Sequence, residues 1–159
     1  MVYERYSGDS DYNGLIASVL RKPSYVSLEY VLGRYDVLTQ GTYPITCVTL
    51  KTGGSFVNKT GTYIYKHIKK SLFTGYQVKN FLEHQYFAAT KTKALFDYLY
   101  YKFPTLAEDF NDRNMVEDLR LKLSSFSKKQ FNKLNYYAKI AKNKKLSKLI
   151  KNIHKHASY

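Results

Sequence analysis

Few side chains in this sequence have the types and the spacing that catalysis requires. His67 and His84 stand well apart, and neither has a serine in a glycine elbow nearby. Cys47 lies within a segment of β-branched residues, where a cysteine is more often a small core residue than a nucleophile. Because no triad of nucleophile, base and orienting acid can be assembled from these residues, the sequence indicates a protein that is not an enzyme.

Metal and cofactor sites are also poorly supported. His154 and His156 are two positions apart, a spacing that places them on different faces of a helix and makes a poor pair of metal ligands. Gly53 and Gly54 lack the lysine and hydroxyl residues of a phosphate-binding loop. The expected strands carry no Asp or Glu, whereas nuclease cores hold a divalent ion through strand carboxylates. We therefore expect neither a metal nor a cofactor.

The distribution of charge gives a clearer indication of a partner. Residues 120–159 contain 12 Lys and Arg and no Asp or Glu, whereas residues 1–119 contain 14 basic and 12 acidic residues. A surface of one sign attracts polyanions, so we expect nucleic acid, an acidic protein or anionic lipid as the partner. The alternative is a solvated helical face that only keeps the protein soluble. The candidate binding residues are Lys128, Lys129, Lys133, Lys144, Lys145, Lys148, Lys151 and Lys155.

The kind of cation in this region limits what it can recognise. Arg120 is its only arginine, and all its other basic residues are lysines. Bidentate readout of guanine mainly uses arginine, whereas lysine suits contacts with phosphates that carry no sequence information. If the partner is nucleic acid, we expect phosphate contacts and not base readout by this region.

A second candidate interface lies on a predicted hairpin over residues 55–68, which turns near 58–61. Alternation along its second strand places Ile64 and Ile68 on one face, and we expect the opposite, tyrosine-rich face to meet solvent or a partner. That face could stack single-stranded bases or form a protein interface, and the alternative is packing within the sheet. The candidate residues are Tyr63, Tyr65, Lys66, His67 and Lys69.

Helical and strand patterns alternate over the first two thirds of the chain. Pro23 should end the first helix, and the hydroxyl of Ser27 should cap the second by accepting a backbone hydrogen bond. The pattern predicts an α+β fold with a small, mostly antiparallel sheet packed with N-terminal and central helices. The expected elements are helices over 12–21, 27–38 and 92–103 and strands over 45–50, 55–58, 62–68 and 86–89.

The remaining chain is predicted to be helical. Ser127 and Gln130 form a capping-box pattern at the start of one helix, and Asn143 separates this helix from the last one. The last helix has an apolar face that should dock on the body and leave the lysines in water. Its apolar residues are Leu146, Leu149, Ile150 and Ile153. We expect residues 1–119 to form the α+β domain and residues 120–159 a basic helical extension packed on it.

Length and composition place the chain in a broad class. With 159 residues and 44% apolar residues, it is long enough for one domain with a core. It has one cysteine, it does not open with a charged and then apolar leader, and no apolar run reaches the roughly 18 residues that span a bilayer. We therefore expect a cytoplasmic protein. A peripheral membrane role for the last helix is disfavoured by the absence of Trp.

Three stretches of the sequence also occur in an informative order. Residues 23–32 read PSYVSLEYVL, residues 61–69 read GTYIYKHIK with LFTG following at 72–75, and residues 89–100 read ATKTKALFDYLY. Together they resemble the C-terminal domain of AbiEi-family antitoxins, which belong to bacterial type IV toxin–antitoxin and abortive-infection systems. In the same order, the corresponding family segments read PSYISLESAL, GxYxYxHIKxxLFxG and AsxEKALlDLlY.

The resemblance implies a function. An AbiEi-like antitoxin would neutralise a cognate nucleotidyltransferase-like toxin without catalysis of its own, and a basic antitoxin could bind the acidic metal-binding surface of such a toxin. The sequence departs from the family at Thr92, where Glu is usual, and it shows no winged helix ahead of residue 23, the part associated with operator binding. The alternative function is a nucleic-acid-binding transcriptional regulator without a toxin partner.

Overall fold

The chain folds around a six-stranded sheet, and the predicted α+β class is confirmed. The computed structural model describes residues 5–6, 8–39, 44–106 and 113–157. The helices are α2 (Ser10–Leu20), α3 (Leu28–Arg34), α4 (Lys91–Lys102), α5 (Met115–Asp118), α6 (Lys128–Ala141) and α7 (Lys144–Ala157), with short 3₁₀ helices η1 (Lys70–Leu72) and η2 (Phe103–Thr105). The strands are β1 (Ser24–Val26), β2 (Ile45–Thr49), β3 (Gly54–Asn58), β4 (Gly61–His67), β5 (Tyr76–Phe81) and β6 (His84–Ala89).

The sheet is mixed, with strand order β3-β4-β2-β1-β6-β5. The hairpins β3–β4 and β5–β6 and the pair β1–β2 are antiparallel, whereas β2–β4 and β1–β6 are parallel. β1 therefore joins two halves of the sheet at its centre. The sequence did not predict β1 or β5, because β1 has three residues after a proline and β5 is an edge strand rich in polar side chains.

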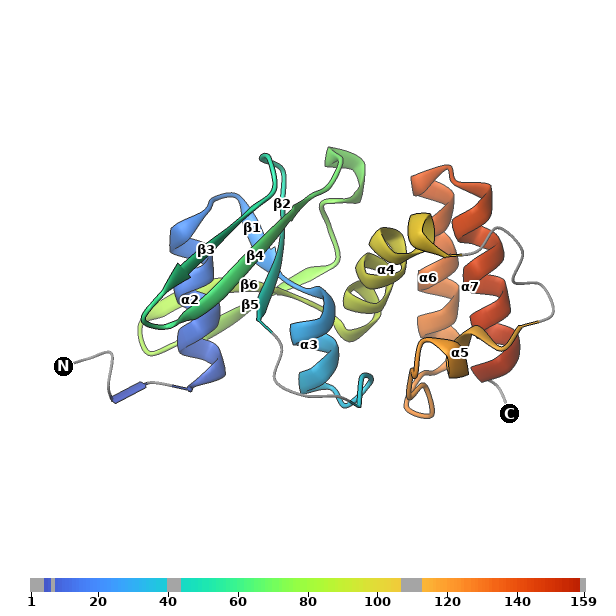
Figure 1. The fold of residues 1–159 in the computed structure, drawn as a ribbon, viewed down its shortest axis with the longest axis horizontal. Helices are drawn as coiled ribbons and strands as arrows, with labels where there is room; N and C mark the ends of the chain where they lie inside the picture. Colours follow the sequence, from blue (N-terminus) through green and yellow to red (C-terminus); the bar gives the residue numbers. More distant parts are fainter. Residues whose placement is uncertain (1–4, 7, 40–43, 107–112, 158–159) are drawn as a thin grey trace.

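Helix α2 packs closely against one face of the sheet. A Cβ atom at Gly14 would lie 2.3 Å from the ring of Tyr86, so a side chain there would push α2 away from the strands. The hydroxyl of Tyr65 donates to the carbonyl oxygen of Ala17, which ties α2 to β4. Figure 1 shows the sheet with α2 at one end of the molecule, α6 and α7 at the other end, and α4 between them.

The outward face predicted for the β3–β4 hairpin is wrong. Tyr63 and Tyr65 are 0% and 2% exposed, because they lie on the face that α2 covers. Ile64, on the opposite face, is partly exposed. The period of two gives the alternation of side chains along a strand, but it does not tell which face a distant helix will cover.

The C-terminal helices follow their local signals. Ser127 Oγ accepts from the backbone N–H of Gln130 at 3.3 Å, and the Gln130 side chain accepts from the backbone N–H of Ser127 at 2.8 Å, so the predicted capping box is confirmed. Lys142 and Asn143 separate α6 from α7. The predicted apolar face of α7 is confirmed as well, since Leu146, Leu149, Ile150 and Ile153 are all 0% exposed.

A buried ion pair joins α4 to the sheet. Lys93 and Asp97, one turn apart on α4, are both 0% exposed. The ammonium of Lys93 donates to Asp97 Oδ1 and, at 2.8 Å, to the hydroxyl of Tyr25. The hydroxyls of Tyr25 and Ser27 donate to Asp97 Oδ2 at 2.9 and 2.7 Å. We call these four residues the Lys93–Asp97 network.

The network also explains one incorrect prediction and two shifted pKa values. Ser27 precedes α3 as expected, but its hydroxyl makes no capping bond and is oriented toward Asp97 instead, to which it donates. Burial lowers the pKa of Lys93 and raises the pKa of Asp97, and the opposite charge of each partner counters both shifts. Each charge is therefore tolerated in the protein interior only while its counter-ion is present.

Removing one member of the pair should destabilise the protein strongly. Lys93→Met keeps the length of the side chain but leaves the Asp97 carboxylate buried without its counter-ion. We expect the free energy of unfolding, measured by urea denaturation, to fall by about 3–5 kcal/mol. Lys93→Met/Asp97→Leu, which removes both charges, should lose less than the two single variants added together. A change within about 0.5 kcal/mol for Lys93→Met would contradict this role.

Buried tyrosines should make the fold sensitive to alkali. Burial and a hydrogen bond to Asp11 raise the pKa of Tyr86 from its ordinary value of 10.0 to about 12, and burial also raises the pKa values of Tyr25, Tyr65 and Tyr101. The folded state thus holds protons that the unfolded chain releases near pH 10, so its stability is intact below pH 10 and declines as pH rises toward 12. Between pH 10 and pH 12, we expect the absorbance of tyrosinate to increase while the circular dichroism signal of the folded protein decreases. Full tyrosine ionisation with an unchanged circular dichroism spectrum would contradict it.

Candidate functional site

A stripe of lysines runs along the solvent-facing side of α7. Lys144, Lys148, Lys151 and Lys155 recur at helical spacing and are all exposed, opposite the buried apolar face. We call these residues the α7 lysine stripe. It presents four positive charges along one line on a helix that contains no Asp or Glu.

The stripe borders a basic groove where α6 meets α7. The groove has a volume of about 490 Å³. Its lining residues are Ala138, Lys139, Lys142, Asn143, Lys144, Ser147, Lys148 and Lys151. Lys139 and Lys142 were not among the residues predicted from the sequence. Lys139 and Lys142 reach this position because α6 and α7 form a helical hairpin. The pattern of charge along α6 does not show that the chain reverses direction after this helix.

Two helix ends of opposite partial charge meet at the groove. The first turn of α7, where helix dipoles place partial positive charge, lies at the groove, and Asn143 Oδ1 accepts a hydrogen bond from the N–H of Leu146 at 3.0 Å. The end of α6 meets the same groove with partial negative charge. There the ammonium of Lys69 donates to the carbonyl oxygen of Ala141 at 3.0 Å and compensates that end. The groove therefore combines lysine side chains with the partial positive charge of a helix N-terminus, both of which attract anions.

The other predicted lysines lie elsewhere on the helical hairpin. Lys145 is partly buried and donates to the carbonyl oxygen of Leu106 at 3.2 Å. The ammonium of Lys133 lies 5.2 and 5.4 Å from the ring centroids of Tyr136 and Tyr137. Lys128 and Lys129 begin α6, at the opposite end of a helix about 20 Å long. The structure thus gathers Lys144, Lys148 and Lys151 at the groove and keeps Lys155 in line with them on α7, whereas the other four predicted lysines lie apart.

The predicted hairpin interface is not one exposed surface. Tyr63 and Tyr65 are buried, and Lys69 caps α6. The ammonium of Lys66 lies 5.2 Å from the ring centroid of Tyr101, and His67 Nδ1 donates to the carbonyl oxygen of Lys51 at 3.2 Å. These side chains have separate partners within the fold.

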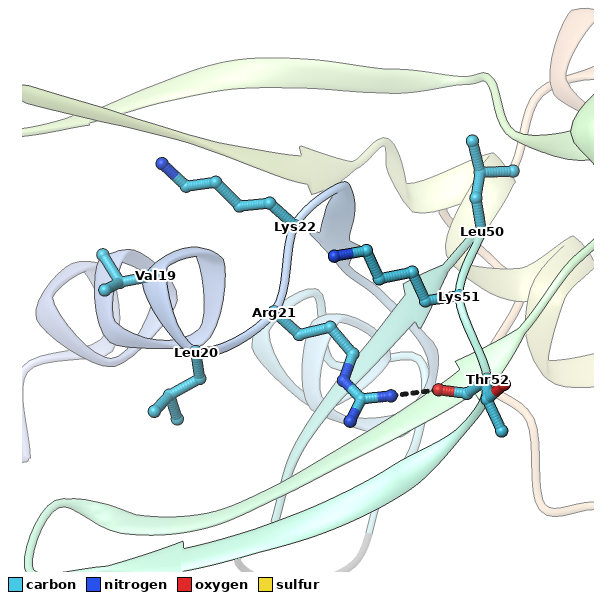
Figure 2. A pocket seen from close by; sticks show the side chains of 7 residues that line it. All are labelled: Val19, Leu20, Arg21, Lys22, Leu50, Lys51 and Thr52. Atoms are coloured by element: carbon cyan, nitrogen blue, oxygen red, sulfur yellow. Dashed lines mark hydrogen bonds between the residues drawn. The ribbon is translucent and has the colours of Figure 1, made fainter.

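A second basic pocket, which the sequence did not indicate, lies between the end of α2 and the loop after β2. Its volume is about 810 Å³, and Arg21, Lys22 and Lys51 are its cations. Figure 2 shows Lys22 and Lys51 extending from two chain segments while Arg21 turns toward Thr52, whose carbonyl oxygen accepts its hydrogen bond. The two segments are distant in sequence, so only the pairing of β1 with β2 brings the cations together.

The described residues offer little of the geometry that metal chemistry needs. Within the ranges described above, no group of three or more His, Cys, Asp and Glu side chains could hold a metal ion. Cys47 is a buried core residue, as predicted, and burial raises the pKa of its thiol. His154 stacks on Phe131 with 4.4 Å between ring centroids. None of the helices described is both long and apolar enough to cross a membrane.

No family model, curated protein or solved structure matches this chain. The geometry is consequently the basis for a functional assignment. A lysine-lined groove at a helix N-terminus can hold the phosphates or carboxylates of a macromolecule. Because the apolar face of α7 is fully buried against the body, the helix keeps these lysines in a fixed arrangement.

The like charges of the stripe should cost α7 some stability. Lys148 has Lys144 and Lys145 on the preceding turn and Lys151 on the following turn. Lys148→Glu replaces these repulsions by attractions, each worth a few tenths of a kcal/mol, so we expect the free energy of unfolding to rise by about 0.5 kcal/mol. The same urea measurement on Lys70→Glu, at an exposed lysine outside α6 and α7, serves as the control. A destabilised Lys148→Glu protein would show that this lysine has a structural role.

Proposed function

We propose that this protein is a non-enzymatic antitoxin that binds and neutralises a nucleotidyltransferase-like toxin through the basic groove and the α7 lysine stripe. The observation that carries the proposal is the groove itself, with Lys139, Lys142, Lys144, Lys148 and Lys151 around one helix N-terminus. Enzymes that handle nucleotides commonly use carboxylates to hold metal ions, and a cationic surface can cover such a site.

The positions of the three stretches that resemble AbiEi-family antitoxins support the proposal. Tyr25 and Ser27 come from the first stretch, and Lys93 and Asp97 from the third. Gly75 closes the second, and a Cβ atom there would lie 2.8 Å from the Lys93 side chain. All three stretches therefore meet at or beside one buried network, so a shared packing requirement can account for their occurring together in one chain.

A second candidate function is binding of nucleic acid without a toxin. It is favoured by the lysine-only composition of the groove, because lysine contacts phosphates well without selecting bases. In this case the chain would act as a regulator or accessory protein on duplex DNA, and its affinity would fall steeply with salt.

The test is binding to the nucleotidyltransferase-like product of the neighbouring gene, measured by titration calorimetry with the purified chain. We expect a complex that weakens as salt rises, because exposed charges are screened. Lys144→Glu/Lys148→Glu should weaken this complex at least about tenfold. Toxin activity should return when the variant replaces the wild-type chain.

The matched control is Lys128→Glu/Lys129→Glu, which changes the net charge equally but lies at the far end of α6. It should retain most of the affinity. Equal loss in both variants would point to long-range charge and not to the groove. A neighbouring product unrelated to nucleotidyltransferases would rule out the antitoxin, and tight binding of duplex DNA that only the groove variant loses would support the second function.

A further inference from the structure

An aromatic-walled cavity opens on the sheet, beside the start of β1. Its volume is about 280 Å³, and the rings of Phe73, Tyr76 and Phe87 form its apolar wall. The ring centroids are 5.4 Å apart for Phe73 and Tyr76 and 5.0 Å apart for Tyr76 and Phe87. Phe87 is 43% exposed, so part of its ring surface faces solvent. The other lining residues are Ser18, Lys22, Pro23, Ser24, Gln85 and Tyr86.

The wall is held in place from behind. The ring of Tyr76 stacks on that of Tyr25, with 5.1 Å between centroids and 25° between planes. The hydroxyl of Tyr25 is fixed in turn by Asp97 and Lys93. An aromatic surface that is already ordered loses little conformational freedom when a flat ligand binds to it.

The cavity and the second basic pocket share one lining residue. Lys22 lines both, and Arg21 and Lys51 line the basic one. In the part of the chain described, no Asp or Glu forms an ion pair with Lys22 or Lys51. Arg21 is positioned over the ring of Phe56, with 5.1 Å from its guanidinium carbon to the centroid. An apolar aromatic wall thus adjoins cations whose charges are not neutralised.

We propose that these two adjoining pockets bind single-stranded nucleic acid, independently of the function proposed for α6 and α7. One base stacks against Phe87 and Tyr76, and the neighbouring phosphates lie along Lys22, Lys51 and Arg21. Aromatic platforms beside a cationic groove bind single strands with little sequence preference. The amide of Gln85, on the cavity wall, can donate to and accept from a base edge.

The geometry favours a single strand over other anions. A duplex hides the faces of its bases, so it cannot use the aromatic wall. A mononucleotide could fill the cavity but would leave most of the larger basic pocket unoccupied. An acidic peptide would match the cations and would gain little from Phe87.

The experiment compares two fluorescently labelled strands of equal length, oligothymidylate and an otherwise identical strand with abasic sites, by anisotropy with the full chain. Both carry the same phosphates, so their difference reports stacking alone. We expect wild-type protein to bind oligothymidylate about tenfold more tightly than the abasic strand. Phe87→Ala should abolish this preference, and Lys22→Glu/Lys51→Glu should weaken binding of both strands.

Two controls make the outcome decisive. Val57→Ala truncates an apolar side chain that is 78% exposed on the opposite edge strand, and Lys144→Glu/Lys148→Glu alters the groove on α6 and α7. Both should keep the preference for oligothymidylate, and thermal unfolding should show that Phe87→Ala is folded. The proposal is overturned if wild-type protein binds neither strand, binds both equally, binds thymidine monophosphate as tightly as the strand, or if Phe87→Ala retains the preference.

Discussion

An ammonium and a carboxylate buried together, with no exposed surface on either, fix how the two ends of this molecule are joined. Bringing two charges out of water costs several kcal/mol per ion, and only complete pairing offsets it. Here Tyr25 and Ser27 donate to the carboxylate that also accepts from Lys93, so the partners come from both the sheet and α4. A shift of α4 by one residue would separate these groups and leave them buried without partners. The pair is weak evidence of high stability, but it strongly specifies one relative position of helix and sheet.

Both candidate surfaces depend on that position. On the sheet side, Tyr25 supports Tyr76 and through it the aromatic cavity. On the helical side, the ring of Phe96 on α4 lies 5.3 Å from that of Tyr137 on α6, and the Lys93 ammonium lies 5.6 Å from the same Tyr137 ring. The Lys93–Asp97 network thus lies between the two surfaces for which binding is proposed, and its contacts reach toward both.

Sequence reasoning succeeded where the signal was local. The capping box at Ser127 and the apolar face of α7 depend on residues within a few positions of one another, and both are as expected. It failed where a distant segment decides the outcome. Tyr63 and Tyr65 look like exposed strand residues until α2 is placed over them, and β1 is too short to carry its own pattern. Lys93 and Asp97 resemble an ordinary surface pair at i, i+4 spacing, because nothing in the sequence shows that β1 and α3 enclose them.

The candidate sites follow the same division. The α7 lysine stripe is visible in the sequence, whereas Lys139, Lys142 and the pocket around Arg21 require the tertiary fold.

A comparison of magnitudes explains how α7 can carry so much charge of one sign. Each of its four fully buried apolar side chains contributes about 1.5–3 kcal/mol when it leaves water. Each repulsion between lysines one turn apart costs only a few tenths of a kcal/mol, and salt reduces it further. Docking therefore exceeds the repulsion several times over, and the helix stays in place without any acidic residue to relieve its lysines. The stability of α7 does not require these charges, so folding does not account for their concentration on one side of the helix.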